Sequence, residues 1–156
     1  MPVRITSPDD YQRLAEFRYR IRAFLSFSER AARAAGIEPQ QHQLLLACKG
    51  LPTTMRPTIG TLAQRLCIEH HSAVALVDKL QARKLVRRAP SQADRREVLI
   101  IVTPEGEKLL AKLSALHKAQ LMQDGPGLLA ALALIISAGA QSDAAASATK
   151  RSRHDT

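Results

Sequence analysis

Apolar residues recur at helical spacing in two neighbouring stretches near the middle of the chain. The first predicts a helix from Ile59 to about Cys67, because Thr58 supplies a capping hydroxyl and the apolar side chains that follow share one face. Those side chains are Leu62, Ala63 and Leu66. The second stretch begins near His70, and its apolar stripe consists of Ala73, Leu76, Val77 and Leu80. Its other face is left free to contact a partner.

Only residues 68–70 separate the two stripes, which is typical of a helix-turn-helix whose second helix enters the major groove of DNA. An ordinary helical hairpin has the same spacing, so spacing alone does not decide between them. The next stretch adds a second signal. Val86 and the run 98–102 are strand-forming residues, and the segment between them carries a proline, turn-forming residues and four arginines. We therefore predict a β-hairpin with a basic tip directly after the second helix.

The flanking regions carry the start and stop signals of further helices. Residues 7–10 (SPDD) begin a long helix that Gly36 ends, and Pro39 begins another that Gly50 ends. Thr103 and Pro104 start a helix that we expect to stop at residues 124–127 (DGPG). The fold class is therefore mainly α with a small β-wing.

Residues 128–138 are apolar on almost every side of a predicted helix. Burial within its own domain would explain this, but a chain of 156 residues has little core left to cover it. We therefore favour an interface between two subunits. Residues 144–156 are small, polar and basic without periodicity, so we expect a disordered basic tail over about residues 141–156.

Charge and composition narrow the class of partner. The formal net charge is +9, which favours a polyanion such as nucleic acid or an anionic membrane surface. The N-terminus lacks an apolar signal core, and the run 128–140 is shorter than the roughly 20 residues that span a bilayer. We expect a cytoplasmic protein with no membrane partner.

The segment from Thr58 to Thr103 resembles the winged helix-turn-helix of MarR-type transcriptional regulators. The resemblance rests on LVDKLQARKLV (76–86), on a hairpin ending in D-x-R (94–96), and on VLIIVTPEGEKLL (98–110). It extends more loosely over residues 7–140. It implies a single domain with a winged helix-turn-helix at about 39–103 and dimerisation helices at about 8–35 and 104–140. Lys84 stands where the family often has a glycine that closes the helix.

The resemblance also implies a DNA-contacting surface. On the second helix of the motif we expect base or phosphate contacts from His71, Ser72, Val74 and Ala75, with Lys79 at a phosphate. At the wing, Arg96 is expected in the minor groove and Arg95 on phosphate, while Asp94 supports the wing tip. Val74 and Ala75 depart from the polar or basic side chains that family members often have there.

A ligand pocket is the least specific expectation. In the resembling family, small aromatic acids or phenols bind between the dimerisation helices and the DNA-binding lobe. Near that junction the chain offers Arg18, Tyr19 and His42, which are equally explained as surface or interface residues.

Other kinds of site are less well supported. Cys67, Glu69, His70, His71 and His117 suggest a metal site, but His70 and His71 point about 100° apart on a helix, so we expect no metal and no other cofactor. Cys48 and Cys67 are expected to be buried, inert thiols rather than redox sensors. The sequence has no G-x-S-x-G, H-E-x-x-H, P-loop or dinucleotide fingerprint, so we expect that the protein is not an enzyme.

The resemblance therefore implies a homodimeric repressor that binds a pseudo-palindromic double-stranded DNA operator and leaves it when a small aromatic or phenolic effector binds. Two alternatives stay open: an architectural protein that binds DNA without sequence preference, and a redox- or metal-responsive regulator.

Overall fold

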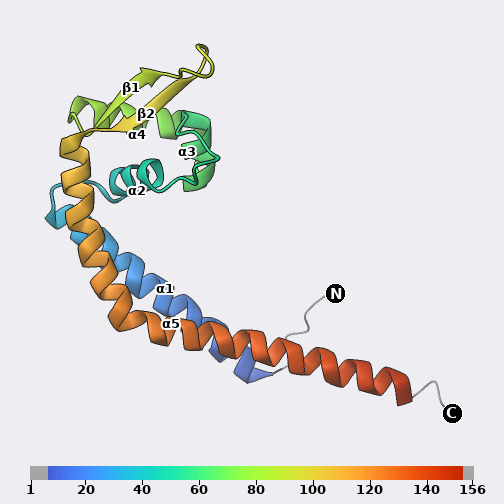
Figure 1. Ribbon diagram of the computed structural model, residues 1–156. Helices are drawn as coiled ribbons and strands as arrows, with labels where there is room; N and C mark the ends of the chain where they lie inside the picture. The colour runs from blue at the N-terminus through green and yellow to red at the C-terminus, as the bar shows by residue number, and fades with distance from the viewer. Residues whose placement is uncertain (1–6, 153–156) are drawn as a thin grey trace. The chain divides into compact units, whose positions relative to one another are not determined.

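The computed structural model describes residues 7–152, and side chains as far as residue 141. Its elements are, in chain order, α1 (Pro8–Ala34), α2 (Pro39–Lys49), α3 (Ile59–Leu66), α4 (His70–Ala82), β1 (Val86–Pro90), β2 (Val98–Val102) and α5 (Pro104–Ser152) (Figure 1). The chain divides into two compact units. The first comprises residues 1–27 and 118–156, and the second comprises residues 28–117. We call the second the winged unit.

The winged unit is built around one apolar core, to which α2, α3, α4 and the β1–β2 hairpin all contribute. Its fully buried large side chains are Ile37, Leu44, Leu45, Leu62, Val77, Leu80, Val86, Ile100 and Leu113. The apolar stripe predicted for the second helix of the motif is buried as expected, at Ala73, Leu76, Val77 and Leu80. The two strands pair antiparallel, with Val86 opposite Val102 and Pro90 opposite Val98. The prediction of a mainly helical fold with a small β-wing is confirmed.

Local signals explain where the helices of this unit begin and end. Pro39 occupies the first turn of α2, and the side chains and backbone of Glu38 and Gln41 form a reciprocal capping box. The Thr58 hydroxyl accepts a hydrogen bond from the Thr61 amide at 3.2 Å and so caps α3. Cys67 ends α3 in the left-handed conformation, with φ of 53°, and this residue makes the turn between the two helices of the motif.

The junction of α4, β1 and α5 is closed by a second left-handed residue. Lys84 has φ of 58°, which is the geometry that a glycine would adopt without strain. Its carbonyl accepts a hydrogen bond from the Thr103 hydroxyl at 2.7 Å. The same hydroxyl accepts from the Gly106 amide at 3.1 Å, capping the start of α5. A Cβ on Gly106 would lie 2.2 Å from the Leu85 carbonyl oxygen, so this close approach requires glycine.

Helix α5 differs from the sequence prediction in two places. The expected stop at residues 124–127 is wrong, because α5 continues through Pro126. A proline removes one backbone hydrogen bond, whereas the leucines and alanines on both sides favour helix at every position. The helix also reaches Ser152, across most of the stretch expected to be a disordered tail, where Ala144–Ala146 and Ala148 have high helix propensity. Residues 153–156 lie outside the described residues.

The apolar stretch after Pro126 is helical as predicted, and in the described structure it is largely uncovered. Leu129 is 68% exposed and Ile136 is 63% exposed, whereas Ala131 is buried. By length and composition, the part of α5 from Pro104 to Gln141 is long and apolar enough to cross a membrane. Exposed apolar surface of this extent is typical of faces that contact another protein chain or a lipid phase.

Candidate nucleic-acid interface

One face of α4 is exposed and carries the residues predicted to contact DNA. His71, Ala75 and Lys79 are exposed, while Ser72 and Val74 are half-buried. The opposite face is held in the core by the buried stripe of this helix. Since the core fixes α4, its outer side chains form a preformed surface rather than one assembled on binding.

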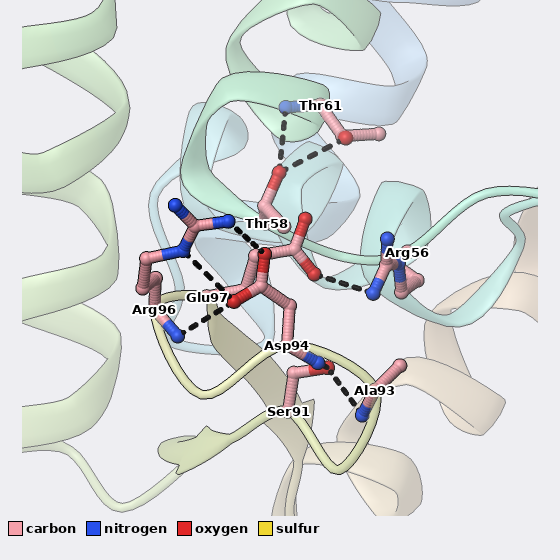
Figure 2. A network of polar contacts seen from close by, with 8 residues as sticks. All are labelled: Arg56, Thr58, Thr61, Ser91, Ala93, Asp94, Arg96 and Glu97. Carbon is pink, nitrogen blue, oxygen red and sulfur yellow. Dashed lines mark hydrogen bonds and ion pairs between the residues drawn. The ribbon is translucent and has the colours of Figure 1, made fainter.

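The wing tip, residues 91–97, is held by hydrogen bonds within the loop (Figure 2). The buried Ser91 hydroxyl accepts from the amides of Ala93 and Asp94 at 3.2 and 3.3 Å. The Ser91 amide donates to the Glu97 carbonyl, and the Glu97 amide donates to the Asp94 carbonyl, each at 3.0 Å. These bonds give the seven-residue tip a defined backbone without a hydrophobic core of its own.

Asp94 and Arg96 contact each other at the outer edge of this tip. The Asp94 carboxylate accepts from the Arg96 amide at 2.9 Å and from the guanidinium at 3.3 and 3.4 Å (Figure 2). The backbone hydrogen bond from Arg96, followed by its side chain, lowers the pKa of Asp94. The Arg96 side chain is nevertheless 92% exposed. It is therefore oriented by Asp94 and still accessible to a polyanion.

A contact that the sequence analysis missed ties the wing to the helix-turn-helix. Glu97 forms an ion pair with Arg56 at 2.6 Å, and Arg56 lies just before α3 (Figure 2). Next to this pair, the Ile100 amide donates to the Pro57 carbonyl at 2.8 Å. The two partners are far apart in the sequence and neither belongs to a recognisable motif, so only the fold brings them together.

Some of the basic residues near α4 have structural partners. Arg88 donates to Gln81 and pairs with Asp78, both at 2.6 Å, and so joins β1 to the end of α4. Arg83 donates to Gln41 on α2 at 3.3 Å. The side chains of Lys79, Arg95 and Arg96 are exposed beside them. The basic run after α4 therefore divides into residues that brace the unit and residues that face solvent.

The three residues nominated for a ligand pocket lie in different surroundings. Arg18 and Tyr19 are exposed on α1 in the first unit, where Tyr19 lines a pocket of about 190 Å³ together with Arg20, Phe24 and Asp124. His42 is buried inside the winged unit.

The two thiols differ from each other. Cys48 is half-buried, and burial raises its pKa to about 12. Cys67 is exposed, so the expectation that it is buried is wrong, because the left-handed turn at the end of α3 leaves its side chain outside the core. Among the residues that the structure describes, no three His, Cys, Asp or Glu side chains gather as metal ligands would.

Residues 35–97, which include the helix-turn-helix and most of the wing, match the protein-family profile described as the MarR family. Over these 63 residues the chain is similar to the MarR family. This match ends inside the wing and leaves all of α1, β2 and α5 outside it.

Similarity to individual MarR-family and related proteins extends the comparison. Over 56 residues the chain is 36% identical to a protein of Bacillus subtilis (strain 168) named "Uncharacterized HTH-type transcriptional regulator YsmB". That match covers 36% of this chain and 38% of the relative, so the chain spans well under half the length of this relative. AbsC, a MarR family transcriptional regulator from Streptomyces coelicolor, is 18% identical, with 94% of this chain and 99% of AbsC covered and a TM-score of 0.68.

The chain is also similar to the regulator CouR in two solved structures. CouR from Rhodococcus jostii RHA1 bound to p-coumaroyl-CoA is 25% identical, with coverage of 65% of this chain and 69% of CouR and a TM-score of 0.58. The transcriptional repressor CouR bound to a 23-mer DNA duplex is 26% identical, with coverage of 76% and 87% and a TM-score of 0.58.

Proposed function

We propose that the protein is a cytoplasmic, sequence-specific transcriptional regulator that binds double-stranded DNA through α4 and the wing. The single observation that carries this proposal is the exposed face of α4 together with the wing that ends in the oriented, solvent-exposed Arg96. A helix of this kind fits the major groove, and an arginine at a wing tip fits the minor groove of an A·T-rich segment. The similarity to CouR, which is described as bound to a DNA duplex, supports the same reading.

The residues proposed to touch DNA have distinct roles. His71, Ser72, Val74 and Ala75 face base edges or phosphates, and Lys79 and Arg95 pair with phosphates. Ser72 and His71 donate or accept hydrogen bonds, whereas Val74 and Ala75 suit a thymine methyl group. Asp94 orients Arg96 rather than touching DNA, because a carboxylate is repelled by phosphate.

We propose further that the protein acts as a homodimer. The exposed apolar surface of α5, including Leu129, Leu134 and Ile136, supports this, since a second copy would remove it from water. Two recognition helices related by a twofold axis would read two half-sites about 34 Å apart, so the operator would be an inverted repeat.

The proposed regulation is repression that a small aromatic or phenolic effector relieves. The support is that CouR is described both as a repressor on DNA and as bound to p-coumaroyl-CoA, which carries a phenol. An effector of this kind would act by favouring a conformation that fits DNA less well.

The deciding experiment selects bound sequences from a random pool of duplex DNA at near-physiological salt. Enrichment of an inverted repeat with half-sites one turn apart supports the specific dimeric regulator. DNA retained without enrichment would instead favour an architectural protein that uses the same surface. Such a protein binds all sequences with nearly the same affinity, so its ratio of specific to nonspecific affinity is near one. A protein that retains no DNA at low salt would overturn the proposed function.

A further inference from the structure

Two histidines stack inside the winged unit, away from the proposed DNA surface. His42 on α2 and His117 on α5 have ring centroids 4.8 Å apart and planes inclined by 16°. His42 is only 3% exposed, and neither of its ring nitrogens has a hydrogen-bond partner. A buried polar group without a partner costs free energy, so this arrangement requires an explanation beyond packing.

The hydrogen bonds of His117 fix which of its nitrogens carries the proton. Its Nδ1 lies 2.6 Å from the Leu113 carbonyl oxygen, and because a carbonyl only accepts, Nδ1 must be the donor. Its Nε2 lies 2.7 Å from the Ser28 hydroxyl, which donates to it while the ring is neutral. His117 thus joins α5 to α1, and its ring face covers His42 on α2. Three helices meet at this pair of rings.

In the described part of the chain, no neighbouring group would stabilise a positive charge on His42. The Ser28 hydroxyl of α1 contacts His117, and the ring of His117 on α5 stacks on His42. On α2, the side chain of the neighbouring Gln41 already accepts a hydrogen bond from Arg83. Glu38, which directly precedes α2, is exposed, and its side chain takes part in the capping box of that helix. Among the described residues no carboxylate pairs with His42. Burial, and then the charge of His117, lower the pKa of His42.

We propose that the His42–His117 stack is a proton-sensitive latch, closed while His42 is neutral and opened when His42 takes up a proton. Opening loosens the packing of α1, α2 and α5 against one another within the winged unit. The consequence for DNA rests on the proposed function: if this unit carries the DNA surface, mild acid weakens operator binding by loosening the support of the recognition helix.

The sign of the effect follows from linkage. A histidine whose pKa is lower in the folded protein than the ordinary 6.5 binds a proton more readily when the chain is unfolded. Its contribution to stability is therefore complete above about pH 6.5. That contribution is lost as the pH falls from there through the lowered pKa of His42. Uptake of one proton on unfolding raises the unfolding equilibrium constant by up to about tenfold per pH unit.

The test measures urea unfolding of the full chain between pH 5.5 and 8 for the wild type and for His42→Phe. Phenylalanine keeps a planar ring to stack on His117 but cannot bind a proton. We expect the wild-type unfolding constant to rise several-fold as the pH falls from 7 to 5.5, and the variant to lose most of that rise. His70→Gln, which removes an exposed histidine outside the proposed DNA contacts, is the matched control and should keep the wild-type profile. A His42→Phe variant with the full wild-type pH dependence would overturn the latch.

A second measurement covers the case in which His42→Phe does not fold. The imidazole resonances of the wild-type protein, followed by NMR through the same pH range, give the pKa of His42 directly. A value below 6.5 supports the latch, and a value at or above 6.5 overturns it. Operator affinity measured at fixed salt then separates this inference from the proposed function. Absence of DNA binding at every pH would overturn the proposed function, whereas the unfolding and NMR measurements would still test the latch.

Discussion

At the scale of single residues, Arg96 is oriented before any DNA arrives. Its contacts with Asp94 reduce the number of side-chain conformations that would have to be given up on insertion into a groove. In the proposed DNA complex, the same carboxylate would have to release part of the guanidinium to the phosphates. Asp94 therefore orients the guanidinium, and its hydrogen bonds from Arg96, which lower its pKa, favour the charged carboxylate.

Replacing Arg96 with alanine tests the proposed minor-groove contact. We expect Arg96→Ala to weaken operator binding by about 1–3 kcal/mol, measured by fluorescence anisotropy at fixed salt. The melting temperature should not change, because the Arg96 side chain is almost fully exposed. Lys112→Ala, which removes one exposed charge from α5, is the matched control and should retain operator affinity. Equal affinities for wild type and Arg96→Ala would exclude the wing from the mechanism.

Gly106 is constrained by space rather than by its backbone angle. We expect Gly106→Ala to destabilise the protein by about 1–3 kcal/mol in urea unfolding, since the new Cβ would lie 2.2 Å from the Leu85 carbonyl oxygen and 2.8 Å from Val102 Cγ1. Gly125→Ala is the comparison, because its Cβ would meet nothing within 4 Å in the helix. That change should stabilise α5 by about 0.5–1 kcal/mol. Equal effects of the two substitutions would contradict the close approach.

Residue-level features were predictable where a local rule governs them. The Thr58 cap and the buried stripe of α4 follow from side-chain chemistry and helical spacing, and both are present. The unusual conformation at Lys84 follows from the family resemblance, and its φ of 58° agrees. The exposure of Cys67 was not predictable, because it depends on a left-handed turn at a residue that rarely adopts one.

At the scale of elements, the wing is attached to the helix-turn-helix through Arg56 and Glu97. Both side chains remain partly exposed, so water screens the pair and its contribution to stability is small. Its structural effect is to fix the base of the wing against the segment that starts α3. No periodicity or motif in the sequence encodes this long-range pairing.

A double-mutant cycle measures this attachment. We expect Arg56→Ala, Glu97→Gln and the combined variant to be non-additive in urea unfolding by about 0.2–1 kcal/mol. The reference is the cycle made from Arg33→Ala and Glu29→Gln, a pair within α1 at 3.5 Å that holds no second element. In operator binding, the Arg56–Glu97 cycle should also show coupling and the reference cycle should not. Additive effects of Arg56 and Glu97 in both assays would contradict the proposed attachment.

Element boundaries were predictable at caps and not within long helices. The start of α2 follows from a proline, the start of α3 from a threonine, and the start of α5 from a threonine, a proline and two acidic residues. Residues 124–127 contain strong helix-breaking residues, yet the long helix-forming flanks on both sides outweigh them. Local preference sums over a whole helix, so four residues do not determine the state of a 49-residue element.

At the scale of the whole molecule, the main feature is the apolar surface of α5 that is exposed to water. A second copy of the chain would cover it, as proposed above. Sequence periodicity indicated that residues 128–138 need a partner, and the structure agrees that they are largely uncovered. Neither identifies the partner, because apolar surface carries no directional information.

A charged substitution in this surface tests the homodimer. We expect wild-type protein to sediment as a dimer, and Leu132→Glu to sediment as a monomer or to unfold, since a buried unpaired carboxylate is costly. Gln123→Glu places the same charge at an exposed polar position of α5 and should leave the dimer intact. A wild-type chain that is monomeric in buffer and partitions into lipid vesicles would exclude the dimer and assign the apolar face to a membrane.

The contrast between the two thiols makes the unmodified chain suitable for spectroscopy. The chain has two cysteines, and the pKa of about 12 keeps Cys48 protonated at neutral pH, whereas Cys67 is exposed. A maleimide fluorophore at neutral pH should therefore attach to Cys67 alone, in the turn between α3 and α4. Its emission would report on the proposed docking of DNA beside α4 without any engineered residue.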